Sequence, residues 1–112
     1  MYTYKAKVVK VIDGDTMDVV VDLGFNMTFK IRLRVMNIDT PEVFKPTSQA
    51  EAQHGSAASG RAKELLMDKD IVIQTYKDAS VYNRYSAKIT MSDNRDFAEV
   101  MVKEGFQKKD KY

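Results

Sequence analysis

Length, composition and charge restrict the chain to few classes of protein. Its 112 residues, 44% apolar and 30% charged, are typical of one globular domain. No apolar run reaches the length of a membrane span, and we expect no membrane partner. The absence of cysteine excludes disulfide scaffolds and thiol catalysis, and a single histidine excludes a multi-histidine metal centre. Sixteen carboxylates leave oxygen ligands for a hard cation, while a net charge of +2 says little about partners.

The first half of the chain alternates apolar and polar residues, which is the period of half-buried strands. This pattern predicts strands over residues 3–12, 16–23 and 27–35. Gly24 and Asn26 tolerate positive φ and predict a turn between the second and third strands. In the third strand we expect one face to enter the core and the other to carry three cations.

A break in this pattern follows the third strand. Pro41 ends the strand because proline cannot continue a ladder, and a loop over residues 44–53 precedes a helix over residues 55–67. Ser48 and Glu51 have the spacing of a capping box, which leaves an earlier helix start open.

Two further strands and a short helix complete the predicted elements. We expect strands over residues 70–76 and 85–92, a helix over residues 97–104, and a solvated tail, QKKDKY, without an apolar partner. Five strands with a helix between the third and fourth is the order of an OB-type barrel. The sequence therefore predicts one mainly β domain, residues 1–112, built as a five-stranded OB-type β-barrel with two helices.

Three polar segments are unusual for a small barrel, although each alone is typical of a turn or a solvated loop. They are residues 13–16, 34–42 and 82–84. Together they indicate a more specific chemistry. Asp15 and Asp39 lie at strand ends, where a barrel could bring them to one hard cation. Arg34 and Arg84 could hold a phosphate from two sides, as phosphodiester hydrolysis requires.

The joint pattern resembles that of the staphylococcal nuclease (thermonuclease) family. The resemblance runs in order from about residue 8 to residue 105 and is carried by four strings: IDGDT at 12–16, RVMNIDTPE at 34–42, YNR at 82–84 and VMVKEG at 100–105. Each string is weak evidence alone, and their order makes the combination specific.

The resemblance implies a Ca²⁺-dependent nuclease that cleaves DNA and RNA between phosphorus and the 5′ oxygen and leaves 3′-phosphates. It implies the following roles: calcium ligands Asp15, Asp39 and, through its backbone carbonyl, Thr40; catalytic residues Arg34, Glu42 and Arg84; Asp13 supporting the ligands; and Tyr82 contacting the nucleotide. The substrate would be single-stranded or frayed nucleic acid with little sequence specificity. His54 is expected to be a packed or capping residue rather than a catalytic base.

Some departures from the family pattern bear on these expectations. Asn37 and Asn83 stand where the family usually has glycine, and Val81 replaces a lysine that contacts phosphate. The family also continues into a third helix across the base of the barrel, whereas this chain stops seven residues after Gly105. Either the barrel and two helices suffice, or a second copy covers the base, as a homodimer would.

Two other classes of function compete with the nuclease. One is an OB-type nucleic-acid-binding module of the same descent that has lost catalysis. The other is an adaptor for acidic partners that uses Lys5, Lys7, Lys30 and Arg32. The five matched positions, Asp15, Arg34, Asp39, Glu42 and Arg84, are all intact, which favours the enzyme.

The first residues lack the apolar core of a signal peptide, so we expect a cytoplasmic protein or a trimmed secreted form.

Overall fold

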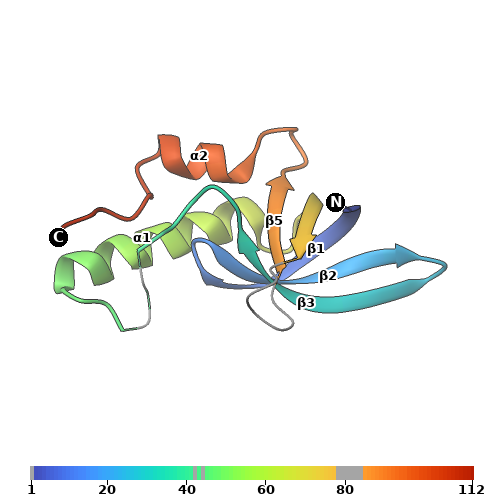
Figure 1. Ribbon diagram of the computed structural model, residues 1–112, viewed down its shortest axis with the longest axis horizontal. Coiled ribbons are helices and arrows are strands. Elements are labelled where there is room, and N and C mark those ends of the chain that lie inside the picture. Colours follow the sequence, from blue (N-terminus) through green and yellow to red (C-terminus); the bar gives the residue numbers. More distant parts are fainter. Residues whose placement is uncertain (1, 42, 44, 78–84) are drawn as a thin grey trace.

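Five strands close into a barrel, and two helices lie beside it (Figure 1). The computed structural model describes residues 2–41, 43, 45–77 and 85–112. Its elements are β1 (Tyr2–Asp13), β2 (Thr16–Gly24), β3 (Met27–Val35), α1 (Gln49–Leu66), β4 (Asp70–Lys77), β5 (Tyr85–Thr90) and α2 (Phe97–Lys103). This order confirms the predicted OB-type barrel, with element ends within a residue or two of the prediction except at α1.

The barrel has the strand order β1-β2-β3-β5-β4. All neighbours are antiparallel except β3 and β5, which are parallel and are joined through α1 and β4. In β1 the register with β2 shifts between Val8 and Lys10 and again between Val11 and Asp13. Such irregularities bend a strand, and this bend lets β1 pair with β2 and with β4 to close the sheet.

The core fills the barrel and continues under α1. Inward-facing residues of every strand are fully buried, including Val8, Val19, Leu33, Ile73 and Ile89. From α1 the buried apolar residues are Ala58, Ala62 and Leu66, the stripe expected for a helix with one apolar face. No helix among the described residues is both long and apolar enough to cross a bilayer.

Helix α1 begins six residues earlier than the predicted start at residue 55. Ser48 is the N-cap, and its side chain accepts a hydrogen bond from the backbone N–H of Glu51 at 3.1 Å. Thr47 also donates to Glu51 Oε2 at 2.6 Å. The two glycines inside the helix, Gly55 and Gly60, each cost only about 1 kcal/mol, which the cap and the buried face outweigh. The spacing of Ser48 and Glu51 therefore marks the true start of α1.

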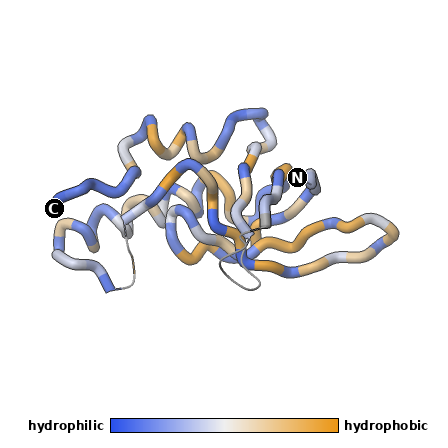
Figure 2. The backbone as a smooth tube through the Cα atoms, in the orientation of Figure 1, coloured by the Kyte–Doolittle hydropathy of each residue, from blue (hydrophilic) through white to orange (hydrophobic). Residues whose placement is uncertain are grey.

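The hairpin of β2 and β3 extends beyond the rest of the barrel (Figures 1 and 2). The prediction that one whole face of β3 enters the core is wrong for its first half, since Met27 is 60% and Phe29 54% exposed. The reason is that β3 pairs with β5 only over its last three residues, Leu33–Val35. Before them, the apolar face of the hairpin extends past the strands that would cover it.

Candidate active site

Asp15 is the buried centre of the candidate site. It lies in the turn between β1 and β2 and is only 5% exposed. Its Oδ1 accepts a hydrogen bond from the Thr16 hydroxyl at 3.0 Å, and its Oδ2 accepts one from the backbone N–H of Thr40 at 2.9 Å. Arg34 forms an ion pair with the same Oδ2 at 3.0 Å. These contacts orient a buried carboxylate that would be costly to leave unpaired.

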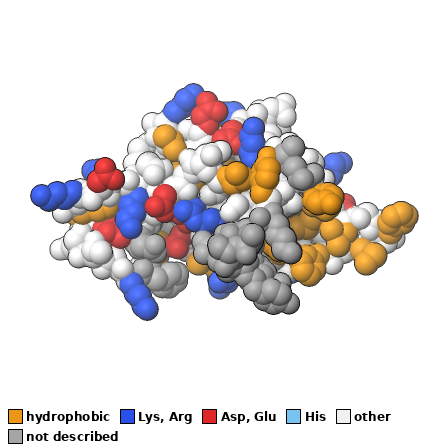
Figure 3. All heavy atoms as spheres, in the orientation of Figure 1, with side chains coloured by type: hydrophobic (Ala, Val, Ile, Leu, Met, Phe, Trp, Pro, Cys, Tyr) orange, Lys and Arg blue, Asp and Glu red, His pale blue; other side chains and the backbone are white. Residues whose placement is uncertain are grey.

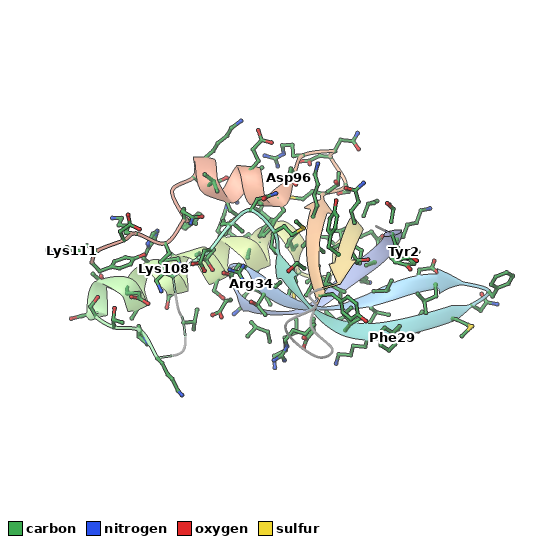
Figure 4. All side chains as sticks on the ribbon, in the orientation of Figure 1. Tyr2, Phe29, Arg34, Asp96, Lys108 and Lys111 are labelled. Atoms are coloured by element: carbon green, nitrogen blue, oxygen red, sulfur yellow. The ribbon has the colours of Figure 1, made fainter. Side chains whose placement is uncertain are left out.

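Arg34 connects the two carboxylates that the sequence analysis singled out. It lies on β3, near the middle of the molecule in Figure 4, and its side chain is 23% exposed. Nη1 donates to the carbonyl oxygens of Val35 at 3.1 Å and Ile38 at 2.9 Å, and Nη2 donates to Asp39 Oδ1 at 3.1 Å. The guanidinium is thus held between Asp15 on its buried side and Asp39 on its solvent side.

The C-terminal segment holds Asp39 by its backbone. The Asp39 side chain is 59% exposed, while its N–H donates to Gln107 Oε1 at 3.1 Å. Its carbonyl oxygen accepts a hydrogen bond from the backbone N–H of Lys108 at 2.6 Å. Gln107, Lys109, Asp110 and Lys111 are exposed, as expected of a solvated tail. The tail nevertheless has partners in the fold, because Gln107 and Lys108 pair with the backbone of Asp39. Sequence reasoning missed Gln107, and no local pattern marks it.

His54 anchors the same segment to α1. Its Nε2 lies 2.8 Å from the carbonyl oxygen of Gly105, and its Nδ1 lies 2.7 Å from the Tyr112 hydroxyl. A carbonyl only accepts, so Nε2 carries the proton, and in a neutral ring Nδ1 accepts from Tyr112. The ring also packs 6.2 Å from Phe106 and 5.8 Å from Tyr112, between ring centroids. His54 is a packed residue, as predicted.

Asp13, Gly14 and Thr40 form the wall behind the carboxylates. Asp13 Oδ1 accepts a hydrogen bond from the backbone N–H of Val43 at 3.3 Å, and burial raises the pKa of Asp13 above its usual value. A Cβ on Gly14 would lie 2.9 Å from Thr40 Cγ2 and 3.0 Å from Ala58 Cβ. Glycine at this position therefore lets the β1–β2 turn approach Thr40 closely.

The structure brings four of the predicted site residues together, with Asp13 beside them. They are Asp15, Arg34, Asp39 and Thr40. Glu42, Tyr82 and Arg84 lie outside the described residues. Among the described residues, no three histidine or acidic side chains form a cluster that could hold a metal ion.

The oxygen donors at this site are of the type that a hard cation takes. In this structure the Arg34 guanidinium lies between the carboxylates of Asp15 and Asp39 and contacts both of them, so the two carboxylates face an arginine rather than each other. Thr40 is 2% exposed, and its Oγ1 has no hydrogen-bond partner among the described residues. Every donor is oxygen, which is the ligand type that calcium and magnesium take.

Comparison with known proteins decides the family. A family model described as "Staphylococcal nuclease homologue" matches residues 32–111, which is more than half of the chain. The chain belongs to the staphylococcal nuclease family. The matched range includes Arg34 and Asp39 and extends into the C-terminal segment that holds Asp39.

Curated relatives of this staphylococcal nuclease homologue agree with that assignment. A thermonuclease of Staphylococcus hyicus is 32% identical over 100 residues, covering 88% of this chain and 55% of its own. An uncharacterized endonuclease of Escherichia coli O157:H7 is 27% identical over 99 residues, covering 88% and 56%. The protein MJ1439 of Methanocaldococcus jannaschii, also uncharacterized, is 31% identical over 124 residues, covering 92% and 58%. The chain thus spans little more than half the length of these relatives.

Proposed function

We propose that this nuclease-family domain is a Ca²⁺-dependent phosphodiesterase that cleaves DNA and RNA at the P–O5′ bond and leaves 3′-phosphates. The observation that carries the proposal is the position of Arg34, held by a buried and an exposed carboxylate at the solvent edge of the barrel. Relatives named thermonuclease and endonuclease support the same class of reaction. We expect single-stranded or frayed substrates with little sequence specificity.

Calcium would be held by the carboxylates of Asp15 and Asp39 and by the backbone carbonyl of Thr40. Bound there, it would supply positive charge against the negative charge that gathers on the phosphate oxygens during the reaction. The chain's own part is to fix the ligands. Asp15 is fixed by the Thr40 N–H, and Asp39 is fixed by Gln107 through its backbone.

Arg34 is well suited to bind a phosphate without leaving its place. Among the described residues, its hydrogen bonds use both Nη1 hydrogens and one on Nη2, which leaves Nε–H and the second Nη2 hydrogen for a ligand. Two such donors in one plane match two oxygens of a phosphate. Because its carbonyl and carboxylate partners already orient the guanidinium, little reorganisation is needed when charge develops.

The remaining roles rest on the resemblance to the family. We propose that Glu42 orients or deprotonates the attacking water, that Arg84 binds the phosphate opposite Arg34, and that Tyr82 stacks on a base. Asp13 would support the ligands from behind, next to Gly14.

The first test is degradation of single-stranded DNA and RNA in calcium, with and without a chelator. We expect cleavage that needs calcium and products that end in 3′-phosphate. Arg34→Ala should lower kcat by about 10²–10³-fold, the usual cost of removing one donor to the transition state.

Arg32→Ala is the matched control, since Arg32 lies two residues away on the same strand and pairs with Asp18 at 2.9 Å. Its activity should stay within a few-fold of the original protein. If the protein binds DNA in calcium but leaves it uncut at excess enzyme, the nuclease proposal fails and the domain is a binding module.

A further inference from the structure

One end of the barrel opens into an apolar pocket whose described lining does not include Asp15, Arg34 or Asp39. The pocket has a volume of about 530 Å³ and is formed where β1, β3 and β5 begin and β2 and β4 end. Four tyrosines line it together with Leu23 and Phe29: Tyr2, Tyr4, Tyr76 and Tyr85. We call this pocket the barrel mouth. Figure 4 places Tyr2 and Phe29 at this end of the molecule, apart from Arg34.

The tip of the β2–β3 hairpin carries a second apolar feature. Phe25 is 98% exposed, and it has φ = +53°, followed by Asn26 at φ = +61°. A left-handed backbone suits glycine or asparagine and is strained for a phenylalanine. The tip therefore combines a strained residue with a fully exposed ring, and Leu23 and Met27 beside it are 43% and 60% exposed. In Figure 3 hydrophobic side chains gather over this end of the molecule.

These two features match each other in shape and chemistry. The barrel mouth is an apolar hollow without an occupant from the described part of its own chain, and Phe25 is an apolar projection without a cover. A surface that carries both a projection and a matching hollow can pair with a second copy about a two-fold axis. The projection of each copy then fills the hollow of the other. We propose that two copies of this chain associate in this way, with Phe25 of each entering the barrel mouth of the other.

The charges favour a second copy over a nucleic acid as the occupant. None of the described residues that line the barrel mouth is charged. Binding of a polyanion would need lysine or arginine along the groove, even where aromatic rings could stack on bases. A protein interface instead has an aromatic centre depleted of charge. A net charge of +2 on each copy also gives little repulsion between copies.

This end of the molecule is large enough for a dimer interface of ordinary size. A stable interface buries about 800 Å² on each partner, which is roughly a tenth of this molecule's 7131 Å². The hairpin tip and the barrel mouth lie next to each other, since Leu23 and Phe29 belong to both the hairpin and the mouth. The proposal does not depend on calcium or on nuclease activity.

Sedimentation velocity from micromolar to several hundred micromolar protein tests the association. We expect a monomer–dimer equilibrium that Phe25→Asp weakens at least ten-fold. Val102→Asp is the matched control, because Val102 is another exposed apolar residue, 43% exposed on α2. It should leave the equilibrium unchanged. A protein that is monomeric at all these concentrations, or a dimer equally sensitive to both substitutions, would overturn the proposal.

Cross-linking tests the contact itself, which is simple in a chain without cysteine. Thr75 lines the barrel mouth. We expect a mixture of Phe25→Cys and Thr75→Cys proteins to form a disulfide-linked dimer under mild oxidation, much faster than either variant alone. Equal rates in the mixture and in the single variants would refute the contact. If a single-stranded oligonucleotide protects the thiol of the Thr75→Cys variant from alkylation while the protein is monomeric, the contact is also refuted and the mouth is assigned to nucleic acid.

Discussion

At the scale of single residues, neighbours with the same pattern have different environments. Arg32 and Arg34 are two residues apart and so lie on the same face of β3, yet the Arg32 side chain is 60% exposed and the Arg34 side chain 23% exposed. The Arg32 guanidinium lowers the pKa of Asp18 through a hydrogen bond. The Asp18 side chain is only 12% exposed, but the exposed arginine keeps the energy of this pair small. Arg34 pairs with Asp15, which is similarly buried, and it also donates to Asp39 and to the carbonyl oxygen of Ile38. Burial of the arginine itself and its additional partners separate the candidate catalytic residue from its neighbour.

Gly14 gives a prediction at this scale. Gly14→Ala should destabilise the fold by about 1–3 kcal/mol, because the new methyl group would lie 2.9 Å from Thr40 Cγ2 and 3.0 Å from Ala58 Cβ. It should also lower nuclease activity, since Thr40 would have to move. Thermal unfolding measures the first effect, and the calcium-dependent assay measures the second.

Gly60→Ala is the control for that substitution. Gly60 lies inside α1, and an added Cβ would meet nothing within 4 Å. This change should raise stability by roughly 0.5–1 kcal/mol because alanine favours a helix, and activity should be unchanged. Equal loss of stability in both variants would show that close packing at Gly14 is not the cause.

At the scale of elements, short-range signals fix where α1 begins. The cap at Ser48 predicts that Ser48→Ala costs about 1 kcal/mol in the free energy of unfolding, since the Glu51 N–H loses its acceptor. Chemical denaturation measures this difference. Ser56→Ala is the comparison, because Ser56 is exposed on the same helix. It should change stability by less than about 0.5 kcal/mol. Similar losses in the two variants would argue against the cap.

Two elements behave in ways that their own sequence does not indicate. The alternation in β3 is regular over its length, but only its last residues have β5 beside them. The C-terminal tail is polar, yet it pairs with Asp39 and packs Tyr112 on His54. In both cases the pattern indicates which face is apolar or polar, while the neighbouring elements decide whether that face is covered.

At the scale of the whole molecule, calcium binding should stabilise the fold by linkage. A ligand that binds only the native state adds about 2.7 kcal/mol at one hundred times its dissociation constant. We therefore expect the melting temperature to rise with calcium and to return to its original value with a chelator. Asp39→Asn should abolish most of this rise without unfolding the protein, since the Asp39 side chain is 59% exposed.

Asp70→Asn is the control for calcium, because Asp70 is exposed at the start of β4 and lies outside the candidate site. It should retain the full shift. A melting temperature that is the same in calcium and in chelator would contradict the proposed metal site, whatever the activity shows.

Much of the fold could be predicted from the sequence, because strand period and turn residues are local. The sequence located the five strands, and alternation in the third strand identified the inward-facing Leu33 and Val35 as core. The order of the motifs indicated the family. For the site, the sequence identified Asp15 and Asp39 as partners. It could not show that Arg34 lies between them, because that depends on how the barrel closes.

The sequence by itself thus determined the elements, the barrel and the family, since each is written in short-range patterns and in the order of motifs. Tertiary structure decided what those elements contact. Gln107 reaches Asp39 across 68 positions, and the hairpin extends past the strands that would cover it. Such contacts depend on strand lengths and on chain closure, which no local window of residues contains.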